Sequence, residues 1–206
     1  MRRPSTRDRL HVRASRSAWL TLLLLVVPPS LMAVDIQPPS IHESTDYRDV
    51  GGATEADLVA SLKSVAASDA SGHRFAGDTR WQLRWNFRVE SAQGRCQVVS
   101  AATELELHTS LVRWNPPLNA KPALVKRWNA FADAVRRHEA GHRDIAVAAA
   151  REVGERGGRL ASEADCETLK RNLDRVANAT LREYRDKENS YDVTTMHGRA
   201  QGATFP

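Results

Sequence analysis

The stretch His138-Glu139-Ala140-Gly141-His142 reads H-E-x-x-H. Two histidines four positions apart on a helix lie on one face, about one turn from each other, so both rings can reach a single metal ion. Glu139 lies on the flank of that face, where its carboxylate can reach a water beside the metal. The pattern predicts a helix that carries a zinc site for hydrolysis, with Glu139 as general base.

The residues before this pattern continue the same helix. Apolar residues recur there at steps of three and four: Leu124, Trp128, Phe131 and Val135. The two histidines follow in the same series, so both rings are expected to face the core, where imidazole nitrogens without partners would cost free energy. A metal ion is one partner for them, and an ordinary hydrogen-bond acceptor in the core is the alternative. The helix is expected over about 122–156, ending at Gly157-Gly158.

Residues 79–109 are expected to form a β-hairpin. Apolar and polar residues alternate from Thr79 to Val89, which is typical of a half-buried strand. A turn is expected at Ser91-Ala92-Gln93-Gly94, followed by a second strand to about Thr109. The core face of that second strand is expected to hold Val99, Ala101, Leu105 and Leu107.

Two further helices are predicted from capping boxes. Thr54-Glu55-Ala56-Asp57 begins a helix that reaches about residue 67, with its core face formed by Leu58, Leu62 and Val65. Ser162-Glu163-Ala164-Asp165 begins another, which reaches about residue 187 and packs antiparallel to the H-E-x-x-H helix. Residues 189–206 show little periodicity and are expected to be irregular.

The first 33 residues differ from the rest of the chain. Residues 1–17 hold six arginines and one acidic residue, an apolar run covers 18–27, and Ala33 suits cleavage. This arrangement predicts a secretory signal peptide over 1–33, with export to the periplasm or beyond it and no stable membrane span afterwards. Without it, 24 basic residues balance 24 acidic ones, so nucleic-acid binding is not expected.

Cys96 and Cys166 are the two cysteines of the chain. In an exported protein an even number of cysteines favours a disulfide, here one that joins the strand region to the second long helix. Closing a loop of about 70 residues would stabilise the fold by roughly 4 kcal/mol. The alternative, zinc ligation, is disfavoured because the two lie far apart and have no closely spaced partners.

The third zinc ligand stays open at this point, although a catalytic zinc ion normally has three protein ligands. The extended metzincin pattern needs glycine at 145 and histidine at 148, where this chain has Ile145 and Ala148, so that class is excluded. Glu163 and Glu167 are candidates on the following helix. His197 is a candidate in the tail.

Several short features along the chain point to one family. They are the stretch from Tyr47 to Leu58, Gly77-Asp78-Thr79-Arg80-Trp81, Cys96, Trp128, Phe131, the H-E-x-x-H pattern, Cys166 and Tyr191-Asp192-x-x-Thr195-x-His197-Gly198. Through them, over about residues 43–202, the sequence resembles a bacterial family of unknown function, domain of unknown function family 922, whose members are regarded as secreted zinc-dependent proteases. The resemblance implies that the tail belongs to the domain and that His197 is the third zinc ligand, beside His138 and His142.

Together these observations predict an α+β, zincin-like domain over residues 47–206, after an extended lead-in over 34–46. A small antiparallel sheet is expected to pack on two long helices. The predicted protein is an exported zinc-dependent peptidase that acts on a peptide or protein of the cell envelope, with Glu139 as general base. Tyr191 is a candidate for stabilising the oxyanion, and a tyrosine packed in the core is the alternative. The alternative functions are a zinc hydrolase acting on peptidoglycan and a non-catalytic envelope protein stabilised by a metal.

Overall fold

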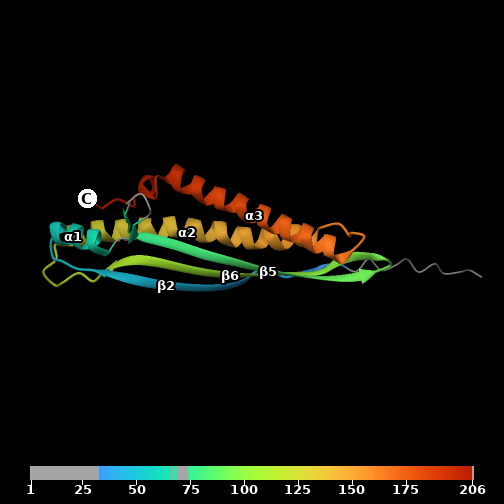
Figure 1. The fold of residues 1–206 in the computed structure, drawn as a ribbon. Helices are drawn as coiled ribbons and strands as arrows, with labels where there is room; N and C mark the ends of the chain where they lie inside the picture. The colour runs from blue at the N-terminus through green and yellow to red at the C-terminus, as the bar shows by residue number, and fades with distance from the viewer. Residues whose placement is uncertain (1–32, 66, 69–73, 206) are drawn as a thin grey trace, which may run out of the picture. The chain divides into compact units, whose positions relative to one another are not determined.

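The central strand of the sheet is β6 (Arg95–Trp114), and the other strands pair with its two edges. β5 (Gly77–Ala92) pairs with it in antiparallel fashion. The chain turns between them at Gln93 and Gly94, which both adopt positive φ, as tight hairpin turns require. β1 (Asp35–Ile36) and β2 (Ser40–Val50) pair with β6 in parallel along the other edge. Figure 1 shows β2, β6 and β5 running side by side.

The computed structural model describes residues 33–65, 67–68 and 74–205. The predicted signal peptide therefore lies outside the described residues, apart from Ala33. Residues from Met32 onward form one unit of the chain. Within the described part, no helix combines the length and apolar character that a membrane span needs.

The α+β class is confirmed, but the expectation of a purely antiparallel sheet is wrong, because two of the three strand pairings are parallel. The residues expected as an extended lead-in, 34–46, form β1 and the first part of β2. The sequence did not predict β2 in full because this strand carries few apolar residues and is mostly exposed, so its residues show no alternation of apolar and polar side chains. Its place is fixed by the backbone ladder with β6, between residues that are distant in sequence.

A β-bulge corrects the predicted core face of the second hairpin strand. Val98 pairs with Val89 and Ser100 pairs with Arg88, so Val99 is the extra residue between two successive pairs. Ala101, Leu105 and Leu107 are buried as expected. Beyond the bulge the alternation changes parity, so Val98 and Cys96 are buried and Val99 is not on the core face.

The short helix α1 (Glu55–Val65) follows β2 and begins with the expected capping box. The Asp57 amide donates to Thr54 Oγ1 over 3.3 Å, and the Thr54 amide donates to Asp57 Oδ2 over 3.1 Å. Leu58 is fully buried on its core face. β3 (Ala67–Ser68) and β4 (Arg74–Phe75) form a separate two-stranded pair before β5.

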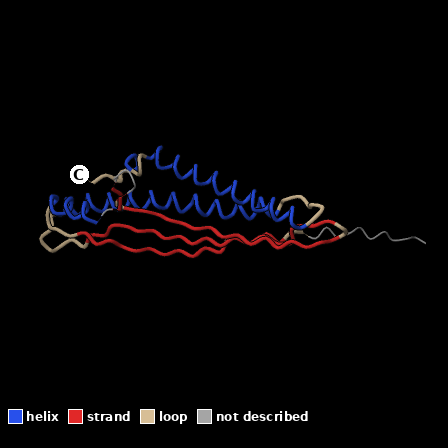
Figure 2. The backbone as a smooth tube through the Cα atoms, viewed as in Figure 1, coloured by secondary structure: helices blue, strands red, loops and turns tan. Residues whose placement is uncertain are grey.

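Two long helices cover one face of the sheet, with α2 (Pro122–Gly158) against the strands and α3 (Cys166–Thr195) lying back along it (Figures 1 and 2). α3 begins where Asp165 accepts a hydrogen bond from the Thr168 amide, at 2.8 Å. It was expected to end near residue 187 but continues to Thr195, where Met196 in the left-handed conformation ends it. The extension places Tyr191 and Asp192 on a helix instead of in an irregular tail.

The predicted disulfide is confirmed. Cys96 and Cys166 are bonded, with their Cα atoms 5.0 Å apart. Next to the bond, the backbone groups of Cys96 and Glu163 exchange two hydrogen bonds of 2.8 and 2.9 Å. The start of β6 is therefore joined to the start of α3.

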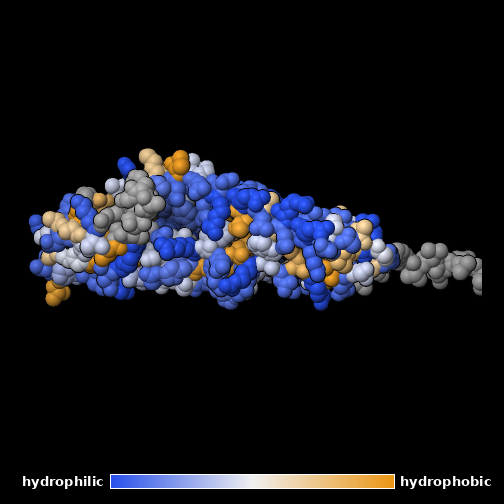
Figure 3. Space-filling model, in the orientation of Figure 1, coloured by the Kyte–Doolittle hydropathy of each residue, from blue (hydrophilic) through white to orange (hydrophobic). Residues whose placement is uncertain are grey.

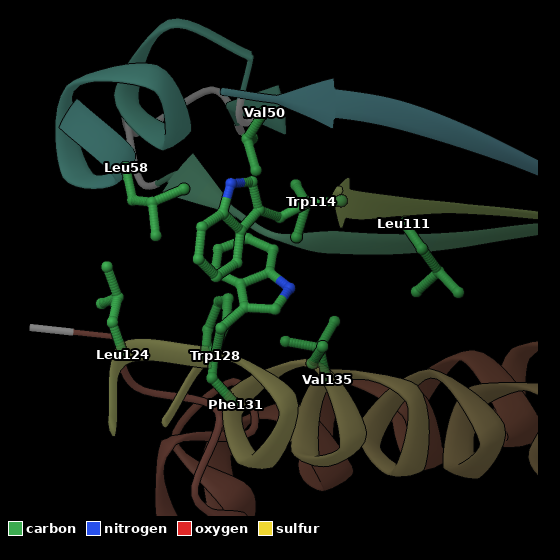
Figure 4. Close-up of a cluster of buried hydrophobic side chains, with 10 residues drawn as sticks. Val50, Leu58, Leu111, Trp114, Leu124, Trp128, Phe131 and Val135 are labelled. Carbon is green, nitrogen blue, oxygen red and sulfur yellow. The ribbon is translucent and has the colours of Figure 1, made fainter. Parts of the chain in front are cut away.

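The core lies between the sheet and the two long helices. Close to the end of α2 at which it begins, aromatic and aliphatic residues from β2, α1, β6 and α2 pack together, among them Trp114 and Trp128, whose ring centroids are 5.7 Å apart (Figure 4). Farther along, α2 presents small residues to the sheet. A Cβ atom at Gly157 would lie 2.2 Å from the Phe87 ring, so glycine there lets helix and strand approach closely. The face shown in Figure 3 is mostly hydrophilic, with hydrophobic residues in small separate groups.

Candidate metal centre

Three side chains that could bind a metal meet where α2 faces the end of α3. His138 and His142 come from α2 and Asp192 comes from α3. Asp192 Oδ1 lies 3.2 Å from His138 Nε2 and 3.0 Å from His142 Nε2. One ligand atom from each residue falls within 4.8 Å of the other two, so the group could hold a metal ion. The prediction that the two histidines of the motif share one face of a helix is therefore confirmed.

The opposite edge of each imidazole ring faces an acceptor. His138 Nδ1 lies 3.1 Å from Gln201 Oε1. His142 Nδ1 lies 3.7 Å from Glu188 Oε1, and that carboxylate also accepts a hydrogen bond of 2.6 Å from Trp81 Nε1. Acceptors in these positions hold the proton on Nδ1 and leave Nε2 toward the centre, as in metal sites where outer partners orient the histidines.

Charge is concentrated at the centre. Burial lowers the pKa of His142, but the hydrogen bond to Asp192 and the nearby Glu188 carboxylate outweigh that effect and raise the pKa to about 10. Burial raises the pKa of Asp192, but hydrogen bonds from His138 and His142 outweigh it and hold the pKa well below its ordinary value. In the metal-free protein near neutral pH, the two groups therefore form an ion pair, and a cation that binds here would displace a proton.

Glu139 lies beside the two histidines and is held by the start of β5. Its Oε2 atom accepts a hydrogen bond of 2.8 Å from Thr79 Oγ1. A Cβ atom at Gly77 would lie 2.5 Å from Glu139 Oε1, so only glycine leaves room for this carboxylate. Burial raises the pKa of Glu139, although the bond from Thr79 opposes that rise. The carboxylate is therefore fixed in position and more basic than an exposed glutamate.

An open cleft of about 670 Å³ contains these groups. Its polar wall is formed by His138, Glu139, His142, Glu188 and Asp192. Its apolar wall comes from α1, α2 and the C-terminal segment and is formed by Leu62, Phe131, Val135, Ala203 and Phe205. A ligand that reaches the metal-binding group would thus also contact apolar side chains.

Tyr191 packs against the centre rather than pointing into it. Its ring stacks on His138 with centroids 5.1 Å apart and planes 11° apart. Its hydroxyl donates to the His138 carbonyl oxygen over 3.2 Å. A Cβ atom at Gly141 would lie 2.2 Å from that hydroxyl, which gives a physical reason for the glycine inside the H-E-x-x-H pattern.

The candidates for the third ligand fall in different places. Glu163 and Glu167 are wrong as candidates for the third ligand, because Glu163 precedes α3 and Glu167 lies in its first turn, far from the two histidines. Their carboxylates accept hydrogen bonds from Asn172 and Arg171. Glu167 is about 37 Å from Asp192 along the helix axis at 1.5 Å per residue. His197 borders the centre, with its Nδ1 atom 3.6 Å from Asp192 Oδ1 and its side chain 44% exposed.

Asp192 is the residue that the sequence interpretation missed. A signal for it exists, since the buried stripe of α3 through Thr180 and Tyr184 continues at helical steps through Glu188 and Asp192. Because these last two positions are acidic, a helix predicted from the spacing of its apolar residues ends before it reaches them. Gln201 was also missed, because it follows the helix and carries no motif.

Comparison with known proteins gives one family. No curated protein and no solved structure matches the chain. The sequence profile of one family, described as bacterial protein of unknown function (DUF922), matches residues 45–198. That range includes α2, α3, the three residues of the metal-binding group and Glu139. The chain belongs to the DUF922 family of bacterial proteins of unknown function.

Proposed function

We propose that this protein is an exported zinc-dependent peptidase with a zincin-like site. The observation that carries the proposal is the convergence of His138, His142 and Asp192 in an open cleft that also holds the buried carboxylate of Glu139. Three protein ligands and access from solvent are typical of catalytic zinc sites, whereas structural sites are closed by four ligands.

The donor set fits zinc. Two imidazole nitrogens and one carboxylate oxygen are a ligand combination that zinc hydrolases use. Asp192 Oδ1 lies 3.0 and 3.2 Å from the two Nε2 atoms. Ligands of a tetrahedral zinc ion, each about 2.0–2.1 Å from it, would lie about 3.3 Å from one another. When bound, zinc makes a water more acidic and polarises a carbonyl group.

The residues around the ion have distinct tasks in this proposal. Glu139 accepts a proton from the attacking water and later delivers it to the leaving amine. Thr79 and Gly77 fix the direction of its carboxylate. Tyr191 positions the His138 ring through stacking and through its hydrogen bond to the His138 backbone. Burial, which raises the pKa of Glu139, suits a general base that works near neutral pH.

Two observations support export. The Cys96–Cys166 disulfide belongs to oxidising compartments such as the periplasm or the medium outside the cell. Residues 1–33 have the composition of a secretory signal peptide. The proposed substrate is therefore a peptide or protein of the cell envelope.

The test compares Glu139→Gln with Glu167→Gln in the purified protein. Glu167 is exposed at the far end of α3, so the same substitution at this position serves as a matched control. We expect one zinc ion per chain in the wild type and both variants, with hydrolysis of an unfolded protein substrate lost only in Glu139→Gln. Unchanged hydrolysis in that variant would contradict the proposal. Activity on peptidoglycan sacculi alone would replace the peptidase with a cell-wall hydrolase.

A second candidate function rests on the position of His197. Because its Nδ1 atom lies 3.6 Å from Asp192 Oδ1, it could close the site as a fourth ligand and make the metal structural. Metal content of His197→Ala separates the two functions. A catalytic site of His138, His142 and Asp192 keeps its zinc in this variant, whereas a closed structural site loses it and the protein melts at lower temperature.

A further inference from the structure

The C-terminal segment contributes a polar side chain to the metal centre from outside the family match. A turn of 3-10 helix, η1 (Arg199–Gln201), follows α3, and Gln201 lies beyond the matched residues 45–198. Its carboxamide bridges the stacked residues His138 and Tyr191. Gln201 Oε1 is 3.1 Å from His138 Nδ1, and Gln201 Nε2 donates to the Tyr191 hydroxyl over 3.1 Å.

These contacts form a closed circuit of hydrogen bonds. The Tyr191 hydroxyl donates its proton to the His138 carbonyl oxygen, so its oxygen is the acceptor for the Gln201 amide. The amide oxygen of Gln201 then faces His138. Because an amide oxygen can only accept, His138 Nδ1 must carry a proton in this arrangement. The other ring nitrogen, Nε2, faces Asp192 and is the one available to a metal ion.

The backbone holds Gln201 in place for this contact. Met196, His197 and Gly198 adopt positive φ and reverse the chain after α3. The backbone N–H of Gln201 then donates to the Gly198 carbonyl oxygen over 2.9 Å. Farther on, Phe205 packs against the rings of Trp128 and Phe131, with centroids 5.3 Å away in each case. The segment is therefore anchored on both sides of Gln201.

One other group competes for the same nitrogen. Thr195 Oγ1 lies 3.5 Å from His138 Nδ1, farther away than Gln201 Oε1 at 3.1 Å. The Thr195 hydroxyl also donates to the Tyr191 carbonyl oxygen over 2.7 Å, so it belongs first to the end of α3. Gln201 is the stronger partner of the ring.

We propose that Gln201 is a positioning residue of the metal centre, which holds the His138 ring with Nδ1 protonated and Nε2 directed at the metal. This inference rests on the proposed function, because it assumes that the centre binds zinc. It goes beyond that function because it predicts that the C-terminal segment, which lies outside the family match, contributes to metal affinity. Outer partners of this kind typically change metal affinity by about 10–100-fold.

The experiment measures zinc affinity of the full-length protein by competition with a chromophoric chelator. Gln201→Met keeps the length of the side chain but can neither donate nor accept strongly. Gln201→Glu keeps the acceptor that faces His138 and loses the donor to Tyr191. Gln82→Met makes the same change on β5 at an exposed position and serves as control. The melting temperature of each metal-free protein reports whether the fold is retained.

We expect Gln201→Met to bind zinc about 10–100-fold more weakly than the wild type, with Gln201→Glu within about threefold of it and Gln82→Met unchanged. A merely structural role would lower the melting temperature of both Gln201 variants and would not separate them in affinity. Affinity of Gln201→Met within about threefold of the wild type would overturn the inference while leaving zinc binding intact. So would a Gln201→Glu variant as weak as Gln201→Met. A wild type that binds no zinc would overturn the inference and the proposed function together.

Discussion

At the scale of single residues, the proposed metal centre depends most on Asp192, because its Oδ1 atom faces both histidines of the motif. Asp192→Asn keeps the size of the side chain and removes the negative charge that a cation needs. We expect zinc affinity to fall by more than about 100-fold, beyond the range typical of an outer hydrogen-bond partner. Chelator competition measures the change.

His197→Ala is the matched comparison, since His197 lies beside Asp192 but at the exposed border of the site. We expect this variant to keep zinc affinity within about tenfold of the wild type, at the low end of the roughly 10–100-fold effect typical of an outer partner. Zinc binding that survived Asp192→Asn and disappeared in His197→Ala would instead make His197 the third ligand.

Gly141 leads to a second prediction at this scale. A methyl group at this position would lie 2.2 Å from the Tyr191 hydroxyl, so Gly141→Ala must displace the ring that stacks on His138. We expect a loss of about 1–3 kcal/mol in the free energy of unfolding, as for other overpacked positions. Urea denaturation measures it. Gly51→Ala is the control, because no atom lies within 4 Å of the added methyl group, and equal losses in both variants would contradict the explanation.

At the scale of elements, the disulfide fastens the start of α3 to the start of β6 across a sequence separation of 70 residues. Replacing both cysteines by serine should lower the free energy of unfolding by about 4 kcal/mol, because the unfolded chain regains the entropy of an open loop. Guanidinium denaturation of the variant and of the wild type, without reductant, measures this difference. The metal centre lies at the other end of α3, so zinc affinity of the folded variant should be unchanged, and a parallel loss of affinity would show that the two ends are coupled.

Elements with a strong local pattern were predicted well. The alternation from Thr79 to Val89, the capping box at Thr54 and the apolar series before His138 each gave an element close to the observed one. Most of β2 was missed because a mostly exposed strand has no alternation, and its parallel pairing with β6 depends on contacts distant in sequence. The two histidines of the site were predicted because a spacing of four residues on a helix places both side chains on one face. Asp192 was not, because its helix was expected to end before it.

At the scale of the whole molecule, the ion pair in the centre links stability to pH. The pKa of His142 is about 10 in the folded protein against an ordinary value of 6.5, so its contribution to stability is complete below about pH 6.5 and is lost as pH rises toward 10. Asp192, whose pKa is lowered by folding, contributes above its ordinary pKa of 3.8 and loses this contribution in acid.

We therefore expect the melting temperature of the metal-free protein to fall between about pH 7 and pH 10. The zinc-loaded protein should lack this fall, because a histidine that binds metal has already lost its proton. Thermal denaturation across this range, with chelator and with zinc, measures both curves. Parallel curves would show that His142 does not exchange a proton for the metal. A His142→Gln variant has no such proton, so the melting temperature of its metal-free form should change less between about pH 7 and pH 10 than that of the wild type.

The two ends of α3 are secured by bonds of different chemistry, a disulfide at Cys166 and the group around Asp192. A thiol reductant opens the first and leaves the second, whereas a chelator would act only on a metal ion bound at the second. With only one of them lost, α3 is still tethered to the sheet or to α2 and can return to its place. In the reducing interior of a cell the covalent tether would not form, so packing and the backbone hydrogen bonds between Cys96 and Glu163 alone would hold the start of α3 to the sheet. For the exported protein that we propose, this loss of stability would last only until the chain reached an oxidising compartment.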